Sequence, residues 1–222
     1  MANVLAARIR DVYDAQADLR HSEVMLNSTC IWPALRSSIY AVDKSRLKFY
    51  PGEERLHAVQ LQLRAAGYEE NSFYKADAVV RTIVNDNQLE ILLLETSNAL
   101  DCTTKAKKSF DFYKALYGTV AMLKSVADVF KYADFSLFSC LKLYFVHVSG
   151  MQIPKALKSL ALIKFWLGKE VRLWSVRNPS EKLFVVLRED KSTVPCSVND
   201  EEKTILSFIQ FFWMLKVQKL AG

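Results

Sequence analysis

Apolar residues recur along the chain with two different spacings, which predict an alternation of helices and strands. In the predicted helices they lie three and four positions apart, because such residues share one face of an α-helix. The longest helix is predicted over residues 105–133, where Phe110, Tyr113 and Leu116 begin the apolar stripe. The other helices are predicted over residues 2–20, 53–66, 154–167 and 200–219, with a helical or mixed piece, interrupted by Pro33, over residues 22–42.

Runs of β-branched and apolar residues bounded by turn residues predict the strands. Residues 73–84 and 89–96 flank Asn85-Asp86-Asn87 and predict a hairpin. Pro51-Gly52 predicts a break, and Asn178-Pro179-Ser180 predicts a turn between two later strands. This order of elements predicts one α/β domain, a central mixed β-sheet flanked by helices. The later strands are predicted over residues 141–148, 171–176 and 183–187.

The register of the predicted hairpin decides the candidate chemistry. If the loop is the three residues 85–87, Asp77 faces Glu95 and Val79 faces Leu93, on one face of the sheet. The two carboxylates would then have Cβ atoms roughly 5 Å apart. A two-residue loop would put the two carboxylates out of step and remove the pair. The same three-residue loop also places Arg81 opposite Ile91 and Ile83 opposite Leu89.

Two carboxylates in such a position repel each other unless something offsets their charge. A divalent cation is the obvious offset, because Mg²⁺ takes carboxylate oxygens as ligands and keeps several waters. Such a site can activate a water and stabilise charge on a phosphate. The hairpin therefore predicts Asp77 and Glu95 as metal ligands, and the alternative is a pair of polar residues where two strands reach solvent.

The hairpin resembles the PD-(D/E)xK nuclease superfamily, whose second strand carries an Asp and whose third strand ends in (Asp/Glu)-x-Lys. The matching residues are Ala76-Asp77 and Glu95-Thr96-Ser97. The resemblance implies a restriction-endonuclease-like core of helix, three strands, helix and strand, over about residues 20–215 within a single domain of residues 1–222. It also implies Mg²⁺ or Mn²⁺ at Asp77 and Glu95, and DNA or RNA as the substrate. The chain resembles, in addition, fungal proteins of similar layout.

The chain departs from the family pattern where the family has its lysine. Ser97 stands there, and a serine side chain supplies no positive charge. Some branches of the family carry the lysine on the following helix, so the resemblance makes Lys114 the candidate catalytic lysine. The alternative for Lys114 is a solvated helix residue. Three further lysines begin the same predicted helix and are also candidates: Lys105, Lys107 and Lys108.

Two other family features are matched only in part. The helix after the third strand reads Gln-x-x-x-Tyr in some branches, and here Tyr113 stands in the place of the Gln before Tyr117. The first helix of the family often supplies another carboxylate, for which Glu23 and Glu53 are alternatives. The lysine departure makes the chain a degenerate member of the family and leaves enzyme activity open.

Two functions remain open at this stage. One is a magnesium-dependent nuclease, a hydrolase of phosphodiester bonds, with Asp77, Glu95 and Lys114 at its site. The other is a non-catalytic module that keeps the fold and binds nucleic acid or a protein. A cation near the two carboxylates would favour catalysis. An apolar plug, or a salt bridge from Arg81 in the same space, would favour the binding module.

The formal net charge of +6 permits contact with nucleic acid, but solvated lysines produce it equally well. We expect Ser97 to be a turn or cap residue and His147 to be a hydrogen-bonded core residue. We expect the tryptophans Trp166, Trp174 and Trp213 in the core rather than stacked on bases. The cations that could line a phosphate-binding face are Lys105, Lys107, Lys108, Lys124, Arg172, Arg177 and Arg188, and the alternative is an ordinary solvated surface.

Composition narrows the protein class. The 222 residues are 51% hydrophobic, enough for a sizeable core, and contain only 6 Gly and 5 Pro. Four scattered cysteines form no CxxC pair, the first twenty residues are too charged for a signal sequence, and no apolar run reaches membrane-spanning length. We therefore expect a soluble intracellular protein of the nucleus or cytoplasm with no membrane partner. The sequence has no GxGxxG or P-loop motif for a nucleotide cofactor.

Overall fold

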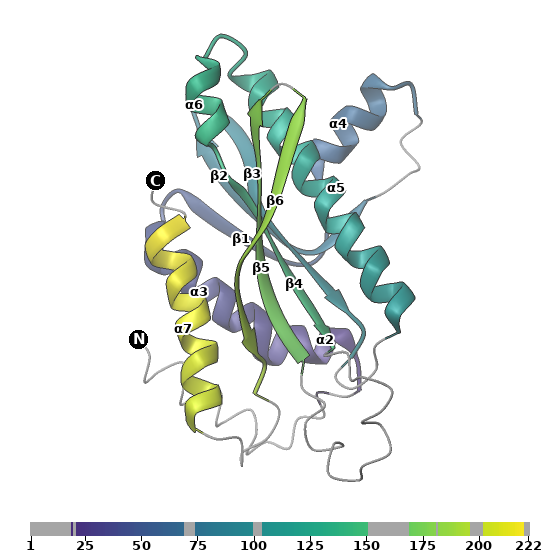
Figure 1. Cartoon of the computed structure of the whole chain (residues 1–222), viewed down its shortest axis with the longest axis vertical. Helices are drawn as coiled ribbons and strands as arrows, with labels where there is room; N and C mark the ends of the chain where they lie inside the picture. The colour runs from purple at the N-terminus through teal and green to yellow at the C-terminus, as the bar shows by residue number, and fades with distance from the viewer. Residues whose placement is uncertain are drawn as a thin grey trace.

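Six strands form one mixed sheet in which the spatial order of the strands follows their order in the chain (Figure 1). The computed structural model describes residues 19, 21–68, 74–99, 104–150, 169–180, 182–195 and 202–219. Strands β3 and β4 are parallel and every other neighbouring pair is antiparallel. The expected α/β domain with a mixed sheet is confirmed. The strands are β1 (Leu47–Arg55), β2 (Lys75–Val84), β3 (Asn87–Ser97), β4 (Leu143–Gly150), β5 (Lys169–Ser180) and β6 (Leu183–Thr193).

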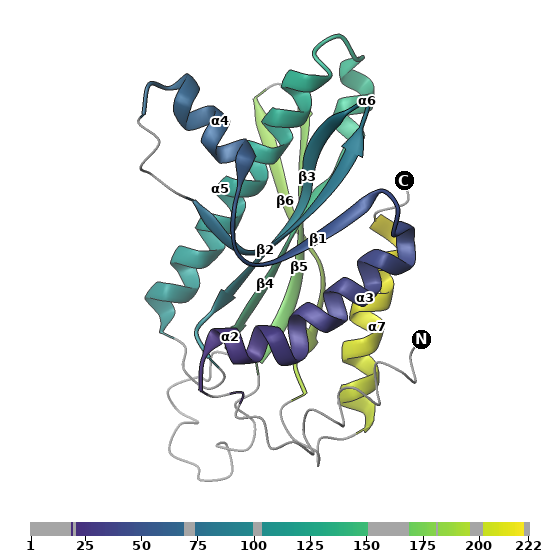
Figure 2. The same ribbon diagram turned by 180° about the vertical axis from the view of Figure 1, so that it is seen from behind.

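Helices cover both faces of the sheet (Figures 1 and 2). Helices α3 and α7 lie together on one face, and α4 and α5 lie together on the other. The connection from β3 to β4 runs through α5, as a parallel pair of strands requires. None of the described helices is both long and apolar enough to span a membrane. The helices are α2 (Glu23–Leu26), α3 (Trp32–Asp43), α4 (His57–Ala65), α5 (Lys105–Val129), α6 (Phe135–Cys140) and α7 (Glu202–Lys219).

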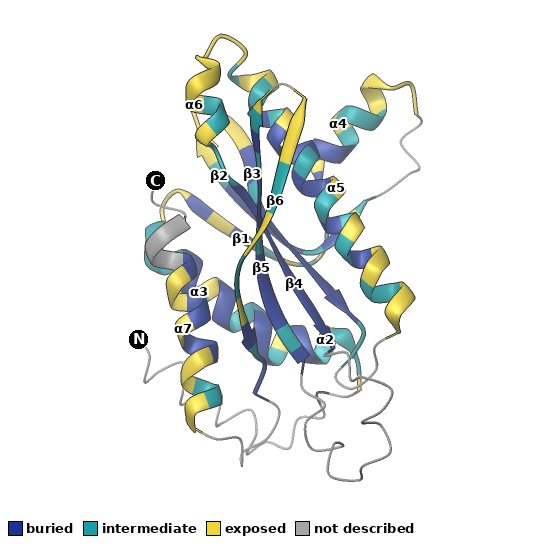
Figure 3. Ribbon diagram, in the orientation of Figure 1, coloured by how far each residue is buried: buried dark blue, intermediate teal, exposed yellow. Residues whose placement is uncertain are grey.

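Alternation along the strands divides the apolar residues between two cores. Val80 and Leu92 face α3 and α7, whereas their neighbours Val79 and Leu93 face α4 and α5. Strand β4 is buried along its whole length (Figure 3), because both of its faces are covered. The central strands therefore hold any polar side chain on the α5 face in a dry and rigid setting.

The predicted break at Pro33 is absent, and the helical path is continuous from Glu23 to Asp43. A π-helical turn, Asn27–Ile31, directly precedes this proline. Proline lacks the N–H of a regular α-helical turn, and a wider turn can accommodate that loss. The Ser22 side chain accepts the Met25 N–H at 3.1 Å and caps the start of the helix.

The first strand was missed, and the helix predicted over residues 53–66 starts later than expected. Glu53 and Glu54 belong to β1, an edge strand that passes through Pro51-Gly52 with an irregularity, and Gly52 has φ 100°. The N-terminus of α4 is capped from another strand: the Glu90 carboxylate accepts the N–H groups of His57 and Ala58, each at 2.9 Å. A cap so distant in sequence leaves no local signal.

The hairpin loop has two residues and not the predicted three. Asn85 and Asp86 both adopt positive φ, as tight two-residue turns require. Near the turn the predicted pairs are therefore wrong, and Arg81 faces Glu90. A β-bulge at Ile91 then adds one residue, and Val79 faces Leu93 as predicted. The bulge restores the expected register just before Asp77 and Glu95.

The remaining differences lie at the ends of elements. The long helix ends at Val129, before the predicted 133, and α6 was not predicted. The predicted turn at Asn178-Pro179-Ser180 is wrong, because these residues belong to β5. The strands β5 and β6 are longer than their predicted apolar cores. The helix predicted over residues 154–167, and that over 2–20 apart from Leu19, lie outside the described residues.

Candidate active site

The Glu95 side chain is the most buried acid on the α5 face, with 2% of its surface exposed. Its Oε2 lies 2.8 Å from the Lys114 ammonium, and its Oε1 lies 3.3 Å from the Tyr74 hydroxyl. That hydroxyl donates to the carbonyl oxygen of Lys114 at 2.9 Å. A hydroxyl has a single proton and the carbonyl can only accept, so a proton on Glu95 is needed for both contacts to be hydrogen bonds.

Asp77 lies next to Glu95, on the neighbouring strand and the same face of the sheet. Its Oδ2 accepts the backbone N–H of Thr96 at 2.6 Å, which fixes the carboxylate against the end of β3. Its other oxygen, Oδ1, makes no hydrogen bond to any residue that the structure describes. The structure thus brings together all three residues predicted for the site: Asp77, Glu95 and Lys114.

Two further carboxylates complete the cluster. Glu23, in the first turn of α2, accepts the backbone N–H of Asn98 and lies 3.3 Å from the Lys107 ammonium. Asp111 on α5, with 3% of its surface exposed, lies 3.1 Å from the same ammonium. We call Glu23, Asp77, Glu95 and Asp111 the carboxylate cluster. It draws on α2, β2, β3 and α5, and Lys107 and Lys114 are the cations in contact with it.

Burial makes these carboxyl groups weak acids. Burial raises the pKa of Asp77 to about 6, and the charges of Glu23 and Asp111 add to the effect. The pKa of Glu95 rises to about 8, mainly because of burial, although the neighbouring Lys114 ammonium opposes the rise. The cluster therefore keeps a proton near neutral pH. A cation that replaced this proton would relieve the same repulsion.

The donor chemistry of the cluster suits a hard divalent cation such as Mg²⁺, which prefers carboxylate oxygens. Asp77 Oδ1 is available as a ligand, whereas both oxygens of Glu95 are engaged by Lys114 and Tyr74. Among the described residues, no three His, Cys, Asp or Glu side chains converge in a metal-binding arrangement. Glu95 can join Asp77 as a ligand once Lys114 moves away from Oε2.

One face of α5 carries a signal for the cluster that the sequence interpretation missed. Lys107, Asp111 and Lys114 are spaced by four and three residues, so they share one side of the helix. This spacing singles out Lys107 and Lys114 among the candidate lysines. Lys105 is exposed, and the Lys108 ammonium donates to the carbonyl of Gly150 at 3.3 Å, beside the cluster rather than within it.

The structure also separates the two candidates for the first-helix carboxylate. Glu23 lies at the cluster, whereas Glu53 is in β1 and pairs with Lys75 at the surface, 2.8 Å away. The Arg81 guanidinium bonds to Glu54 at 2.8 Å and to Glu90 at 3.2 Å, so it does not fill the space between Asp77 and Glu95.

Ser97, where the family that the hairpin resembles has its lysine, is buried at the end of β3 and so does not lie in a turn, one of the two predicted alternatives. Its Oγ lies 2.9 Å from His147 Nε2 on β4. The prediction that His147 is a hydrogen-bonded core residue is confirmed. Burial lowers the pKa of His147 to about 3, and the positive charges of Arg172 and Lys108 add to the shift, so the imidazole is neutral at physiological pH.

Two of the predicted core tryptophans are described. Trp174 is half-buried and packs edge-on against Phe112, with ring centroids 5.0 Å apart. Trp213 on α7 is 42% exposed, so its predicted core position is wrong. Trp166 lies outside the described residues.

Comparisons of this chain with protein-family models, with curated proteins and with solved structures found no match. The chemistry of the carboxylate cluster therefore has to be judged from its own geometry.

Proposed function

We propose that this protein is a PD-(D/E)xK nuclease-like hydrolase that cleaves phosphodiester bonds in nucleic acid with the help of Mg²⁺ or Mn²⁺. The observation that carries the proposal is the 2.8 Å contact between the Lys114 ammonium and Glu95. It supports Lys114 as the source of the positive charge that Ser97 cannot provide. A lysine on the helix after the third strand is one arrangement that the family resemblance implies.

The order of the elements supports the same proposal. A helix, the strands β1 to β3, the helix α5 and the strand β4 follow one another, with α4 inserted between β1 and β2 and α6 after α5. The parallel pairing of β3 and β4 agrees with a sheet built around such a crossover. This element order supports the proposal of a restriction-endonuclease-like core.

The proposed roles follow from the contacts. Asp77 and Glu95 would hold the cation, and Glu95 would first have to lose its proton, so we expect activity to rise with pH towards about 8. When bound between them, a divalent cation would supply a lowered pKa for a water ligand and positive charge to offset a phosphate. Lys114 would leave Glu95 Oε2 before the cation binds there, and its ammonium would then stabilise the negative charge that develops on the phosphate. Tyr74 keeps the Lys114 backbone in place through its hydrogen bond to the carbonyl oxygen.

A second candidate function is a non-catalytic module that binds nucleic acid with the same fold. The observation that favours it is the occupation of both Glu95 oxygens, by Lys114 and by Tyr74. An ion pair that neutralises the site permanently would exclude a metal. The two functions differ in whether the ion pair opens when metal and substrate are present.

A cleavage assay separates the two functions. Purified protein is incubated with labelled single- and double-stranded DNA and RNA, with Mg²⁺, with Mn²⁺ and with chelator. Asp77→Asn, Glu95→Gln and Lys114→Met are tested beside Lys124→Met, which removes one exposed charge from the same helix. We expect metal-dependent cleavage by the wild type. The cleavage rate should fall by a factor of about 10² or more in each of the three site variants, because each lacks a group that would bind the metal or stabilise the charge on the phosphate.

Cleavage that survives all three site substitutions would remove the reaction from the carboxylate cluster. An absence of cleavage on every substrate, with the wild-type protein folded, would favour the non-catalytic module.

A further inference from the structure

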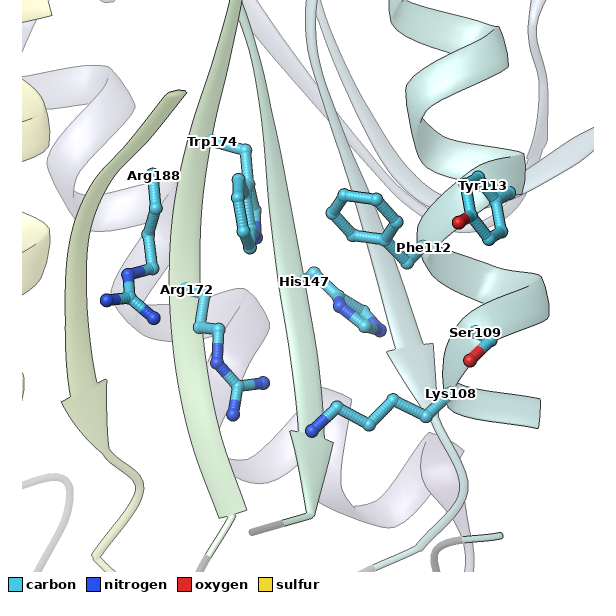
Figure 4. Close-up of a pocket in the computed structure, with 8 residues that line it drawn as sticks. All are labelled: Lys108, Ser109, Phe112, Tyr113, His147, Arg172, Trp174 and Arg188. Atoms are coloured by element: carbon cyan, nitrogen blue, oxygen red, sulfur yellow. The ribbon is translucent and has the colours of Figure 1, made fainter. Parts of the chain in front are cut away.

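A cavity of about 360 Å³ lies beside the carboxylate cluster, on the same face of the sheet. Three cationic side chains from three elements line it: Lys108 from α5, Arg172 from β5 and Arg188 from β6. Figure 4 shows Lys108 reaching from the helix towards the Arg172 guanidinium, Trp174 beside Arg188, and Phe112 and Tyr113 on α5. A volume of this size is at the lower end of the range for small-ligand sites.

Of the three cavity cations, Arg172 is buried, Lys108 is half-buried and Arg188 is exposed. Arg172 is 8% exposed, and its guanidinium donates to the Ser149 hydroxyl and to the Glu170 carboxylate. Glu170 also lies 3.3 Å from the Lys191 ammonium. One carboxylate is thus shared by two cations, and Lys108 adds a third positive charge nearby.

The electrostatic consequence is an excess of positive charge in a half-buried space. Burial lowers the pKa of Lys108, and the proximity of Arg172 lowers it further. An anion in the cavity would offset both the burial and the repulsion between the cations. Phosphate suits such a site, because arginine binds phosphate oxygens through two parallel N–H groups.

Aromatic side chains line the cavity together with these cations. Phe112, Trp174 and Tyr113 line it. The Tyr113 ring is 66% exposed and meets Phe112 edge-on, with ring centroids 5.5 Å apart. Exposed aromatic faces beside a cationic surface are the usual means of holding a nucleobase and its phosphate together.

The cavity and the carboxylate cluster are aligned by strand register. Glu95 pairs with His147, His147 with Arg172, and Arg172 with Lys191, in one row across the sheet. Neighbouring strands are about 4.8 Å apart, so Arg172 lies roughly 10 Å from Glu95. A strand of nucleic acid crossing this row would meet carboxylates first and cations about one nucleotide later.

We propose that this cavity binds one nucleotide unit of a nucleic-acid strand, with the phosphate on Lys108, Arg172 and Arg188 and the base against Tyr113 and Trp174. The nucleotide is the neighbour of the one whose phosphodiester bond meets the carboxylate cluster. This second statement rests on the proposed function, whereas binding in the cavity does not.

Binding is measured in chelator, so that it is independent of metal and of cleavage. The probe is a short single-stranded DNA with a fluorescent label at its 3′ end. Its binding is measured by fluorescence anisotropy over a range of salt concentrations. Arg188→Gln, Lys108→Gln and Tyr113→Ala change side chains at exposed or half-buried positions, so they leave the fold intact. Lys124→Gln, on the exposed side of α5, is the matched control.

We expect Arg188→Gln and Lys108→Gln each to weaken binding about tenfold and to lower the slope of log affinity against log salt by about 1. Tyr113→Ala should weaken binding by roughly tenfold with an unchanged salt slope, because stacking involves no phosphate charge. Lys124→Gln should bind as the wild type does. AMP and inorganic phosphate are added as competitors to test whether the cavity also binds a free nucleotide or binds only a nucleic-acid strand.

If AMP displaces the probe more efficiently than phosphate does, the proposed site is supported, and a free nucleotide is an additional ligand. Probe binding that AMP does not displace, but that the cavity variants weaken, would support it with the strand as the ligand. The proposal is overturned by an absence of probe binding, by unchanged affinity in all three cavity variants, or by an equal loss in Lys124→Gln.

Cleavage without an effect of the cavity variants would overturn this site and leave the proposed function standing. Binding without cleavage would do the reverse.

Discussion

The Glu95 carboxyl lies between two opposing influences, its burial under α5 and its contact with the Lys114 ammonium. Burial dominates, and the pKa rises to about 8. The unfolded chain releases this proton near its ordinary pKa of 4.5, whereas the folded chain keeps it to higher pH. The contribution of this carboxyl to stability is therefore fully present below pH 4.5 and is lost as the pH rises towards 8.

Glu95→Gln removes this titration and should flatten the dependence of the melting temperature on pH. We expect the variant to gain stability relative to wild type as the pH rises from about 4.5 to about 8, because only the wild type must keep a buried carboxyl protonated. A smaller slope below about pH 6 should remain in the variant, from Asp77. Thermal unfolding followed by circular dichroism across this range measures both effects.

Glu53→Gln is the matched control, since Glu53 is an exposed carboxylate with a lowered pKa, paired with Lys75. The plot of its melting temperature against pH should stay parallel to that of wild type between pH 6 and 8. Parallel curves for Glu95→Gln as well would mean that Glu95 is already ionised in the folded protein at low pH.

Among the elements, α5 decides the geometry of the site, because it carries Lys107, Asp111 and Lys114 on one face. It approaches the sheet closely at Gly118, where a Cβ would lie 2.8 Å from the Tyr74 hydroxyl oxygen and 2.9 Å from side-chain carbons of Leu56 and Leu93. These distances are too short for a carbon atom. The absence of a side chain at this position brings the helix near enough for Lys114 to reach Glu95.

Gly118→Ala should therefore destabilise the protein although alanine favours helices. We expect a net loss of about 1–2 kcal/mol, the cost of overpacking minus the gain in helix propensity. The loss should be smaller in a Tyr74→Phe background, because the closest atom is the Tyr74 hydroxyl oxygen. Urea unfolding of the four variants measures the coupling. A stability of Gly118→Ala equal to or above wild type would show that the helix can retreat at no cost.

Local patterns predicted most of the elements but not their irregularities. The hydrophobic spacing predicted β2, β3 and the start of α5, since these depend on residues that are near in sequence. The strand β1 and the start of α4 depend on Glu90, a distant residue, and were missed. The register at Asp77 is as predicted for a reason that the sequence did not reveal, the bulge at Ile91 that compensates for the shorter turn.

The candidate site divides in the same way. Asp77 and Glu95 follow a short motif on adjacent strands, so the sequence could predict them. Asp111 could have been found from its spacing to Lys107 and Lys114 on the helix. Tyr74 lies just before β2, and its role depends on how closely α5 packs, which no local pattern encodes.

On the scale of the whole molecule, one sheet face under α5 carries opposite charges at its two sides. The carboxylate cluster lies on α2, β2, β3 and α5, and the cations of the cavity lie on β5, β6 and the start of α5. A chain with a formal net charge of +6 thus concentrates acids where a cation would bind and positive charge where a phosphate would bind. The proposed metal-dependent function on nucleic acid is argued from this arrangement.

Metal binding by the carboxylate cluster is the central claim, and calorimetric titration with Mn²⁺ at about pH 8 tests it most directly. We expect wild type to bind Mn²⁺ with release of protons to the buffer, because the metal would displace the proton of Glu95. Binding should be lost in Asp77→Asn and in Glu95→Gln, and kept in Glu202→Gln, which removes an exposed carboxylate from α7. No binding by wild type, or equal binding by wild type and Glu95→Gln, would contradict a metal site at Asp77 and Glu95.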